Sequence, residues 1–448
     1  MLDYNLLLAV FLGIFVLLVL ILRFKIQAFI SLLIASITVG IVAGMAPNEI
    51  ISTMQQGMGD TLGFVALVVG LGAMFGAVLE HSGGAEALAN YLLHKFGEKR
   101  ASWALMITGF FVAIPVFFDV AFIILIPIIY SLQRKTKKSL LLYAIPLLAG
   151  LAITHSFIPP TPGPVAVADI LKADLGWVIL FGIITGIPTA IISGPLFAKY
   201  IAKKIHIDAP VLEKRTQEVA QYPAVHLIIT IIGIPILLIV CNTVINSPII
   251  SEHLISKNGK NWIAMIGNPF VALVIANLLA WYVLGIKRGV SKEKMLRITT
   301  KAMAPAGIII LLTGAGGVFK QTLINTGTGE MLANYFSDSG ISMLFFGFFI
   351  AAIVRILQGS ATVAMITAAG ITAPLLITGT ISEIDKALLV IAIASGASIL
   401  SHVNDSGFWL VGKYLNLTEK QTFKSWTMMT TIIAFVGFFV VNIISLLV

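Results

Sequence analysis

The stretch Gly70–Tyr91, GLGAMFGAVLEHSGGAEALANY, returns as Gly314–Tyr335, GAGGVFKQTLINTGTGEMLANY, with ten of twenty-two residues identical at a constant offset of 244. Weaker echoes follow it, since Thr154-His155 pairs with Ser401-His402 and Asp119-Val-Ala121 pairs with Thr362-Val-Ala364. An internal duplication of this length in an apolar chain is typical of transporters, whose two halves form a site that faces each side of the membrane in turn. The duplication therefore predicts two structurally related halves.

The composition indicates a membrane protein. Of the 448 residues 58% are hydrophobic and only 11% are charged, and the mean hydropathy is +1.01. Apolar runs of about 20 residues, the length that crosses a bilayer, recur along the chain. The first run, Tyr4–Leu22, has no basic leader and no small-residue cleavage site, so we expect a retained span rather than a signal peptide. The single cysteine, Cys241, cannot form an internal disulfide.

We predict ten membrane spans, of which the fourth and the ninth are broken. They cover residues 4–22, 27–46, 60–82, 139–172, 176–200, 225–246, 262–286, 304–325, 385–412 and 425–447. Surface helices are expected at Pro47–Met58, Ala85–Phe96 and Ser291–Met303. With these spans, 23 of the 29 Lys and Arg residues fall on one side, which marks the cytoplasmic face. The net charge of +9 is thus an orientation signal, and we expect no nucleic-acid partner.

Two further apolar segments fit no complete crossing. Ala101–Gln133 has basic residues before and after it, so both of its ends belong in the cytoplasm. Its two arms of about 15 residues reach roughly 22 Å each, which is short of the ~30 Å hydrocarbon core. We predict a re-entrant hairpin that turns near Pro115–Asp119. Ile341–Thr378 is its predicted counterpart from the outside, turning near Gln358-Gly359-Ser360.

The predicted fold class is an all-α polytopic membrane protein with two inverted repeats, each of five spans plus one re-entrant hairpin, and with two broken helices. The first repeat covers residues 1–201 and holds the inner hairpin, 101–133. A cytoplasmic connector covers 202–224. The second repeat covers 225–448 and holds the outer hairpin, 341–378. The repeats are inverted because Gly70–Tyr91 runs toward the cytoplasm, whereas its copy runs away from it.

Four irregular elements indicate a polar pocket near the membrane midplane. Prolines at 159, 160, 162 and 164 interrupt the fourth span, and the ninth opens at His402–Gly407. Backbone without helical hydrogen bonds survives at this depth only inside protein or beside water. Each break also leaves a helix N-terminus, whose partial positive charge suits a carboxylate. The two hairpin tips contribute further polar residues.

The expected substrate-binding residues come from the breaks, the hairpin tips and two buried cations. They are His155, Ser156, Thr161, Lys320, Arg355, Gly359, Ser360, Thr362, His402 and Asn404. Arg355 or Lys320 is expected to anchor a carboxylate, with a structural ion pair as the alternative for either. The matched histidines are expected to donate to substrate hydroxyls or to titrate, the alternative being ordinary buried residues.

Asp119 and Asp405 are the expected proton-coupling residues. A carboxylate at membrane depth costs free energy, so its presence there indicates a function. Substrate contact or a tip cap is the alternative for Asp119, and helix capping is the alternative for Asp405. No metal site is expected, since the histidines lack a second ligand at helical spacing. No cofactor is expected either, because the glycines near 70–76 follow no strand and no Walker lysine motif occurs.

The chain resembles the gluconate permease family of proton symporters over essentially its whole length. The resemblance rests on THSFIPPTPGP at 154–164, GSATVA at 359–364 and SHVND at 401–405. It implies proton-driven uptake of gluconate or a related hydroxy acid across a bacterial inner membrane. It also implies a homodimer with a scaffold and elevator-like transport units. Departures from the family pattern at Asp119, Thr161 and Ser406 leave D-serine, glycerate and ketogluconate-like acids open as substrates.

Two other classes compete with a transporter. An intramembrane hydrolase could use histidine and serine, but no serine lies in a nucleophile motif. The repeats also place matched groups rather than distinct acid and base residues, so we expect no enzyme. A passive channel needs no site that closes to each side in turn, whereas inverted hairpins favour such a site.

Overall fold

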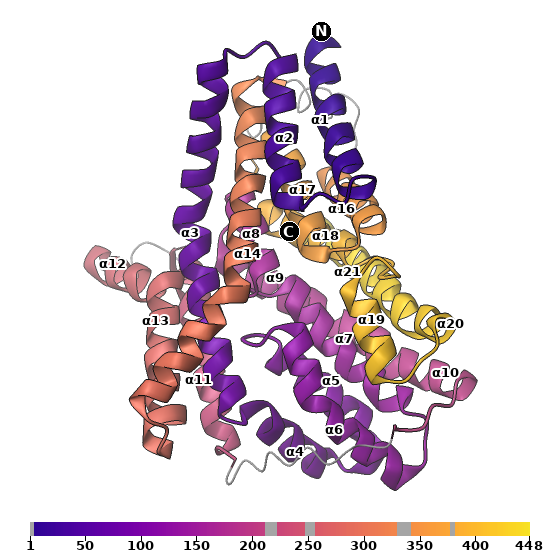
Figure 1. Cartoon of the computed structure of the whole chain (residues 1–448). Coiled ribbons are helices and arrows are strands. Elements are labelled where there is room, and N and C mark those ends of the chain that lie inside the picture. The colour runs from indigo at the N-terminus through magenta and orange to yellow at the C-terminus, as the bar shows by residue number, and fades with distance from the viewer. Residues whose placement is uncertain (1–3, 211–221, 247–255, 329–341, 377–380) are drawn as a thin grey trace.

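All regular secondary structure in the computed structural model is helical within the described residues, 4–210, 222–246, 256–328, 342–376 and 381–448 (Figure 1). The helices of the first part are α1 (Tyr4–Leu22), α2 (Ala28–Val42), α3 (Pro47–His81), α4 (Gly84–Phe96), α5 (Ala101–Val112), α6 (Phe118–Thr136), α7 (Leu141–Phe157), α8 (Pro162–Leu171), α9 (Leu175–Ile191) and α10 (Phe197–Lys204). The second part holds α11 (Val225–Asn246), α12 (Lys257–Ile266), α13 (Pro269–Ala280), α14 (Lys292–Asn325), α16 (Met343–Gln358), α17 (Ala361–Thr372), α18 (Glu383–Ala397), α19 (Ser406–Tyr414), α20 (Glu419–Thr422) and α21 (Met428–Leu447).

Eight helical stretches among the described residues are long and apolar enough to cross a membrane, which confirms the all-α membrane class. The predicted second and ninth spans correspond to α2 and to α18 with α19, which are too short to count among the eight. Three predicted segments lie partly outside the described residues. These parts are 211–221 of the connector, 329–335 of the copied segment, and 341 and 377–378 at the ends of the outer hairpin.

Two of the predicted surface helices are wrong. Pro47–Met58 and Ser291–Met303 are the first turns of α3 and α14, which continue without interruption for 35 and 34 residues. Their polar composition suggested a surface position, but the two long helices pack against each other along this part. The seventh span also begins later than predicted, because Asn268 caps α13 at Phe270 N (3.0 Å) and Pro269 starts the helix.

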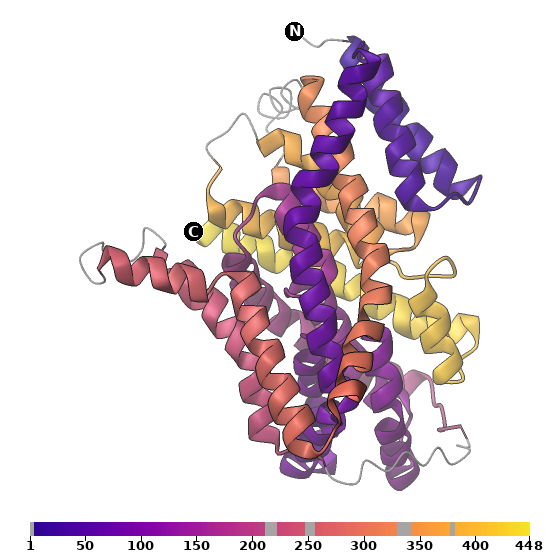
Figure 2. The same ribbon diagram turned by 60° about the vertical axis from the view of Figure 1, so that its left-hand side comes forward.

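The two copies of the repeated segment lie in α3 and α14, which run side by side (Figures 1 and 2). The helices begin 245 residues apart (47 and 292) and end 244 apart (81 and 325), close to the offset of the duplication. Thr53 accepts a hydrogen bond from Asn325 (2.8 Å), whereas Gly57, further along α3, packs against Gly317, earlier in α14. The pair is therefore antiparallel, which is the relation that inverted repeats predict.

The helix interruptions fall where the sequence suggested them. α7 ends at Phe157 and α8 begins at Pro162, while α18 ends at Ala397 and α19 begins at Ser406. A loop over 113–117 separates α5 from α6, and residues 359–360 separate α16 from α17. Re-entry of these two helix pairs into a bilayer stays a prediction, as does the division into repeats at 201 and 225.

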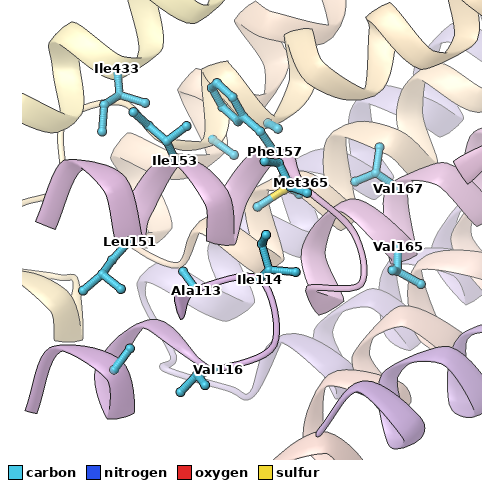
Figure 3. Close-up of a cluster of buried hydrophobic side chains, with 14 of the residues drawn as sticks. Ala113, Ile114, Val116, Leu151, Ile153, Phe157, Val165, Val167, Met365 and Ile433 are labelled. Carbon is cyan, nitrogen blue, oxygen red and sulfur yellow. The ribbon is translucent and has the colours of Figure 1, made fainter. Parts of the chain in front are cut away.

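The core joins the interrupted helices of both copies into one body. α7 and α18 are buried almost all round, as helices that are apolar on every face should be. Figure 3 shows Phe157 of α7 and Ile114 of the 113–117 loop beside Met365 of α17, and Met365 also packs against Gly163 of α8. Tyr130 of α6 also donates a hydrogen bond to the Tyr414 carbonyl of α19. Hairpin and broken helix therefore support each other across the duplication.

Candidate functional site

A cavity of about 580 Å³ lies where both breaks and both hairpins meet. This volume is within the range of small-molecule sites, roughly 300–1,000 Å³. Three helix N-termini open onto it: Asp119 and Val120 in the first turn of α6, Ala361 and Thr362 in that of α17, and Ser406 and Gly407 in that of α19. Such N-termini present unpaired backbone N–H groups and a partial positive charge.

Nine of the twelve residues singled out from the sequence line this cavity. They are Asp119, His155, Ser156, Arg355, Gly359, Ser360, Thr362, Asn404 and Asp405. Thr161, Lys320 and His402 are not among its walls. The cavity thus collects residues that are separated by almost 290 positions in the sequence.

Arg355 and Asp405 form a buried ion pair at one wall. Arg355 Nη2 lies 2.5 Å from Asp405 Oδ2, and the two side chains are only 5% and 13% exposed. Arg355 stands in the last turn of α16, where the helix dipole favours a cation. Asp405 caps α19 by accepting from Gly407 N (3.1 Å). The alternative roles left open by the sequence, structural pairing and helix capping, are both present here.

Ser401 ties this ion pair to the last helices. Its hydroxyl donates to Asp405 Oδ2 and accepts from Trp426 Nε1 (2.6 Å). Its backbone N–H donates to Thr430 Oγ1 (3.2 Å). These contacts fix the carboxylate of Asp405 in one orientation, so the guanidinium that it holds is preorganised.

Asp119 and His155 face the cavity without protein partners. The Asp119 carboxylate makes no hydrogen bond or ion pair among the described residues, and it is close enough to Asp405 for electrostatic repulsion. His155 Nδ1 is buried with no hydrogen-bond partner within the same residues. The imidazole ring packs against the edge of Phe117, with 6.5 Å between ring centroids. The unpaired Nδ1 of His155 is shielded inside the protein, which is rare for a polar atom, whereas the Asp119 side chain is exposed to the cavity, a space that a ligand could fill.

The tip of the second hairpin is bound to the second break. Gly359 ends α16 at φ +92°, a left-handed conformation that favours glycine, and any side chain there would overlap the Asn404 carbonyl. Asn404 Nδ2 donates to the carbonyls of Ile356 (3.1 Å) and Leu357 (3.2 Å). His402 Nε2 lies 2.9 Å from the same Ile356 oxygen. His402 and Asn404 therefore satisfy the last carbonyls of α16.

Thr161 and Lys320 lie elsewhere. The Thr161 hydroxyl donates to the Ile158 carbonyl (2.5 Å) inside the first break. Lys320 is half-buried in α14, and its electrostatic partners are Asp169, Lys172 and Asp60. Lys320 is therefore not a wall of this cavity in the present conformation, and Arg355 is the cation that is.

Several lining residues were not anticipated from the sequence. They are Phe117, Phe118, Gln358, Ser398, Trp426 and Thr430. Ser406, which lies within the predicted opening of the ninth span at 402–407, also lines the cavity. Trp426 and Thr430 belong to the last span and carry no local signal, since only the packing of that span on the break brings them in. Within the described residues, no group of three or more His, Cys, Asp and Glu could hold a metal ion.

Comparisons with known proteins cover nearly the whole chain. The family model described as GntP family permease matches residues 5–447. The gluconate permease of Pseudomonas aeruginosa is 39% identical over 451 residues, with 99% of this chain and 98% of that protein covered. The inner membrane permease YgbN of Escherichia coli K12 is 40% identical over 442 residues, with 96% of each covered.

One solved structure shows the same fold at low sequence identity. The crystal structure of the Alcanivorax borkumensis YdaH transporter, reported to have an unusual topology, matches with a TM-score of 0.62. The match covers 89% of each chain at 14% identity, so it bears on the fold alone.

Proposed function

Because the chain belongs to the GntP family of permeases, we propose that it carries gluconate or a related small hydroxycarboxylate through a bacterial inner membrane in symport with protons. The chain is a multi-span membrane permease and not an enzyme. The Pseudomonas aeruginosa relative is named as a gluconate permease. D-serine or another small acid is the alternative substrate of the same class.

The observation that carries the proposal is the cavity with three helix N-termini and one guanidinium. In our account the substrate carboxylate lies against these N-termini, near the Arg355–Asp405 pair. Ser156, Thr362 and the imidazole of His155 then bind the substrate hydroxyls. A chain of several hydroxyls suits a site with dispersed hydroxyl and imidazole groups.

Proton coupling follows from the charges that face the cavity. Arg355 is neutralised by Asp405, which leaves the Asp119 carboxylate without a counter-ion. A substrate anion that enters would meet that negative charge at short range. One proton on Asp119 removes the repulsion, so the anion and the proton bind together more readily than either binds alone. His155 is the second candidate for the proton.

Alternation between the two sides is proposed to be elevator-like. The hairpin-bearing parts, about 97–201 and 339–448, slide against a scaffold formed by the rest of a homodimeric assembly. The antiparallel packing of α3 and α14 supports this, because each copy then offers the sliding unit a similar track in opposite directions.

The direct test uses purified protein in proteoliposomes with an imposed pH gradient, acidic outside, and labelled gluconate. We expect accumulation above equilibrium that collapses when a protonophore dissipates the gradient. Accumulation that follows a sodium gradient, or uptake that never exceeds equilibrium, contradicts proton symport. A thermal-shift screen against sugar acids and D-amino acids identifies the acid, because a bound ligand stabilises the folded state by mass action.

A further inference from the structure

The two copies differ at a position where a hairpin tip meets the scaffold. In the first copy, Gly76 of α3 packs directly against the backbone at Pro115, the tip of the first hairpin. A Cβ atom at Gly76 would overlap the Pro115 carbonyl oxygen, so no side chain fits there in this conformation. At the offset of 244 the counterpart of Gly76 is Lys320, and at the offset of 243 that pairs Asp119 with Thr362 the counterpart of Pro115 is Gln358, next to Gly359.

In this conformation the hairpin tip at Gly359 lies beside a part of α14 that is far from Lys320. The cavity at the Gly359 tip takes its α14 walls from Pro305 and Ile309. Lys320 is eleven residues beyond Ile309, or roughly 16 Å along the helix at 1.5 Å per residue. Next to Lys320 lies instead Gly370, near the C-terminal end of α17, the return helix of the second hairpin.

Lys320 is meanwhile engaged with charges outside the cavity. Its electrostatic partners include Asp169 at the end of α8 and Asp60 of α3. The Asp169 side chain is only 6% exposed, and its Oδ1 lies 3.1 Å from Lys172 Nζ. Its other oxygen, Oδ2, is buried with no hydrogen-bond partner among the described residues. Asp169 is thus paired with Lys172, and Lys320 stands near these charges without an ion pair of its own among the described residues.

The present conformation opens toward the cytoplasmic side. A second cavity of about 410 Å³ shares Phe117, Val120 and Pro305 with the site and reaches Glu80 and Lys301. Lys301 belongs to the basic N-terminal part of α14, which the excess of positive charge assigns to the cytoplasm. Lys320 lies toward the opposite end of α14, hence toward the outside.

If the two copies exchange their conformations, the site moves along α14 and comes to lie beside Lys320. If each hairpin takes the place that the other now has, the Gly359 tip reaches α14 at Lys320, as the Pro115 tip now reaches α3 at Gly76. The residue of the second hairpin beside Lys320 changes from Gly370 to Gly359, again eleven residues or roughly 16 Å. A lysine side chain prevents contact as close as that at Gly76, so the tip must stand away from α14 and leave room for an ammonium group.

We propose that Lys320 is a side-dependent substrate-binding residue, which holds the substrate carboxylate in the outward-facing state and is withdrawn to the vicinity of Asp169 in the inward-facing state. This inference rests on the proposed transport function. Lys320 adds a positive charge to the anion site on the outer side only. The anion then binds more tightly outside and is released inside, where Arg355, already paired with Asp405, is the remaining cation.

The test compares apparent KM values at the two faces, using right-side-out and inside-out vesicles with labelled gluconate. For Lys320→Met we expect the outer KM to rise about tenfold or more and the inner KM to change less than about twofold. Lys320→Arg keeps the charge and should restore most of the outer affinity. An unchanged outer KM, or an equal rise at both faces, overturns the proposal.

The double variant Lys320→Met/Asp169→Asn separates binding from simple charge balance. If Lys320 only neutralises Asp169, the double variant recovers wild-type KM at both faces, and this result also overturns the proposal. If Lys320 binds the substrate, the outer KM of the double variant stays high. Failure of the wild type to transport any acid counts against the proposed function instead, whereas normal wild-type transport with a silent Lys320→Met counts against this inference alone.

A cross-link reports on the conformation itself with Lys320 retained. With Cys241 replaced by serine, Phe319→Cys introduces a thiol beside Lys320 on the side of α14 that faces the second hairpin, and Ala361→Cys introduces one at the hairpin tip. We expect a disulfide to form in membranes and to stop uptake until it is reduced. Absence of this disulfide under oxidation, in protein that transports normally, contradicts the approach of the tip to Lys320.

Discussion

At the scale of single residues, the Arg355–Asp405 pair decides how the site holds together. Both side chains are buried, so removal of one partner leaves an uncompensated charge. We predict that Arg355→Met lowers the unfolding free energy by on the order of 3–5 kcal/mol and abolishes uptake. Arg355→Met/Asp405→Asn should regain most of the stability but not the uptake. Thermal unfolding in detergent with uptake assays measures both, and recovered uptake in the double variant contradicts substrate binding near Arg355.

Asp119 carries the corresponding prediction for coupling. Asp119→Asn removes the unpaired negative charge that requires a proton when the anion binds. We expect loss of accumulation under a pH gradient, while exchange of internal for external substrate continues. The matched control is Asp208→Asn, an exposed aspartate far from the cavity walls, which should behave like the wild type. Normal accumulation by Asp119→Asn makes Asp119 a structural residue.

Which residues line the cavity was partly predictable from the sequence. Asp119, Arg355 and Asp405 stood out because ionisable groups are costly at membrane depth. Their pairing could not be predicted, since Arg355 and Asp405 are 50 positions apart and meet only through the packing of α16 on the second break. His402 was expected to contact substrate, yet its ring is hydrogen-bonded to the Ile356 carbonyl. This carbonyl lies in the last turn of α16 and has no partner within the helix.

At the scale of elements, the second hairpin depends on its glycine. Gly359 adopts φ +92°, and a Cβ there would also overlap the Asn404 carbonyl. Gly359→Ala should therefore cost about 1 kcal/mol for the left-handed backbone alone, and more for the overlap. We expect reduced uptake and a lower melting temperature. Gly233→Ala in α11 is the control, because no atom lies within 4 Å of its Cβ position; equal effects of the two variants contradict this account.

The interruptions of the fourth and ninth spans could be predicted from the sequence, whereas the lengths of α3 and α14 could not. Pro159 and Pro160 fall in the first interruption, and Pro162 takes the first position of α8, where proline is tolerated. The second interruption covers 398–405 and so begins four residues before the predicted opening.

The predicted surface helices before α3 and α14 failed for a tertiary reason. The polar segment of α3 packs on α14 where Gly57 meets Gly317, and the polar segment of α14 reaches α3 where Met303 meets Gly70. Both helices therefore continue through their polar parts.

At the scale of the whole molecule, the duplication explains why one chain can present one site to two sides. The copies in α3 and α14 run antiparallel, and the hairpin tips meet them differently, at Gly76 in one case and far from Lys320 in the other. That difference is the asymmetry that an alternating transporter shows in either of its end states. A sequence comparison finds the duplication but cannot tell which of the two states the chain adopts.

The central claim is that the hairpin-bearing unit slides along α3 and α14, and a reversible cross-link tests it most directly. Ala73 of α3 and Val116 at the first hairpin tip line the same small cavity, so cysteines at these positions, with Cys241 replaced by serine, can be joined by oxidation. We predict that proteoliposomes with the completed disulfide take up no gluconate and regain uptake when the disulfide is reduced. Undiminished uptake by the fully cross-linked protein would contradict the account.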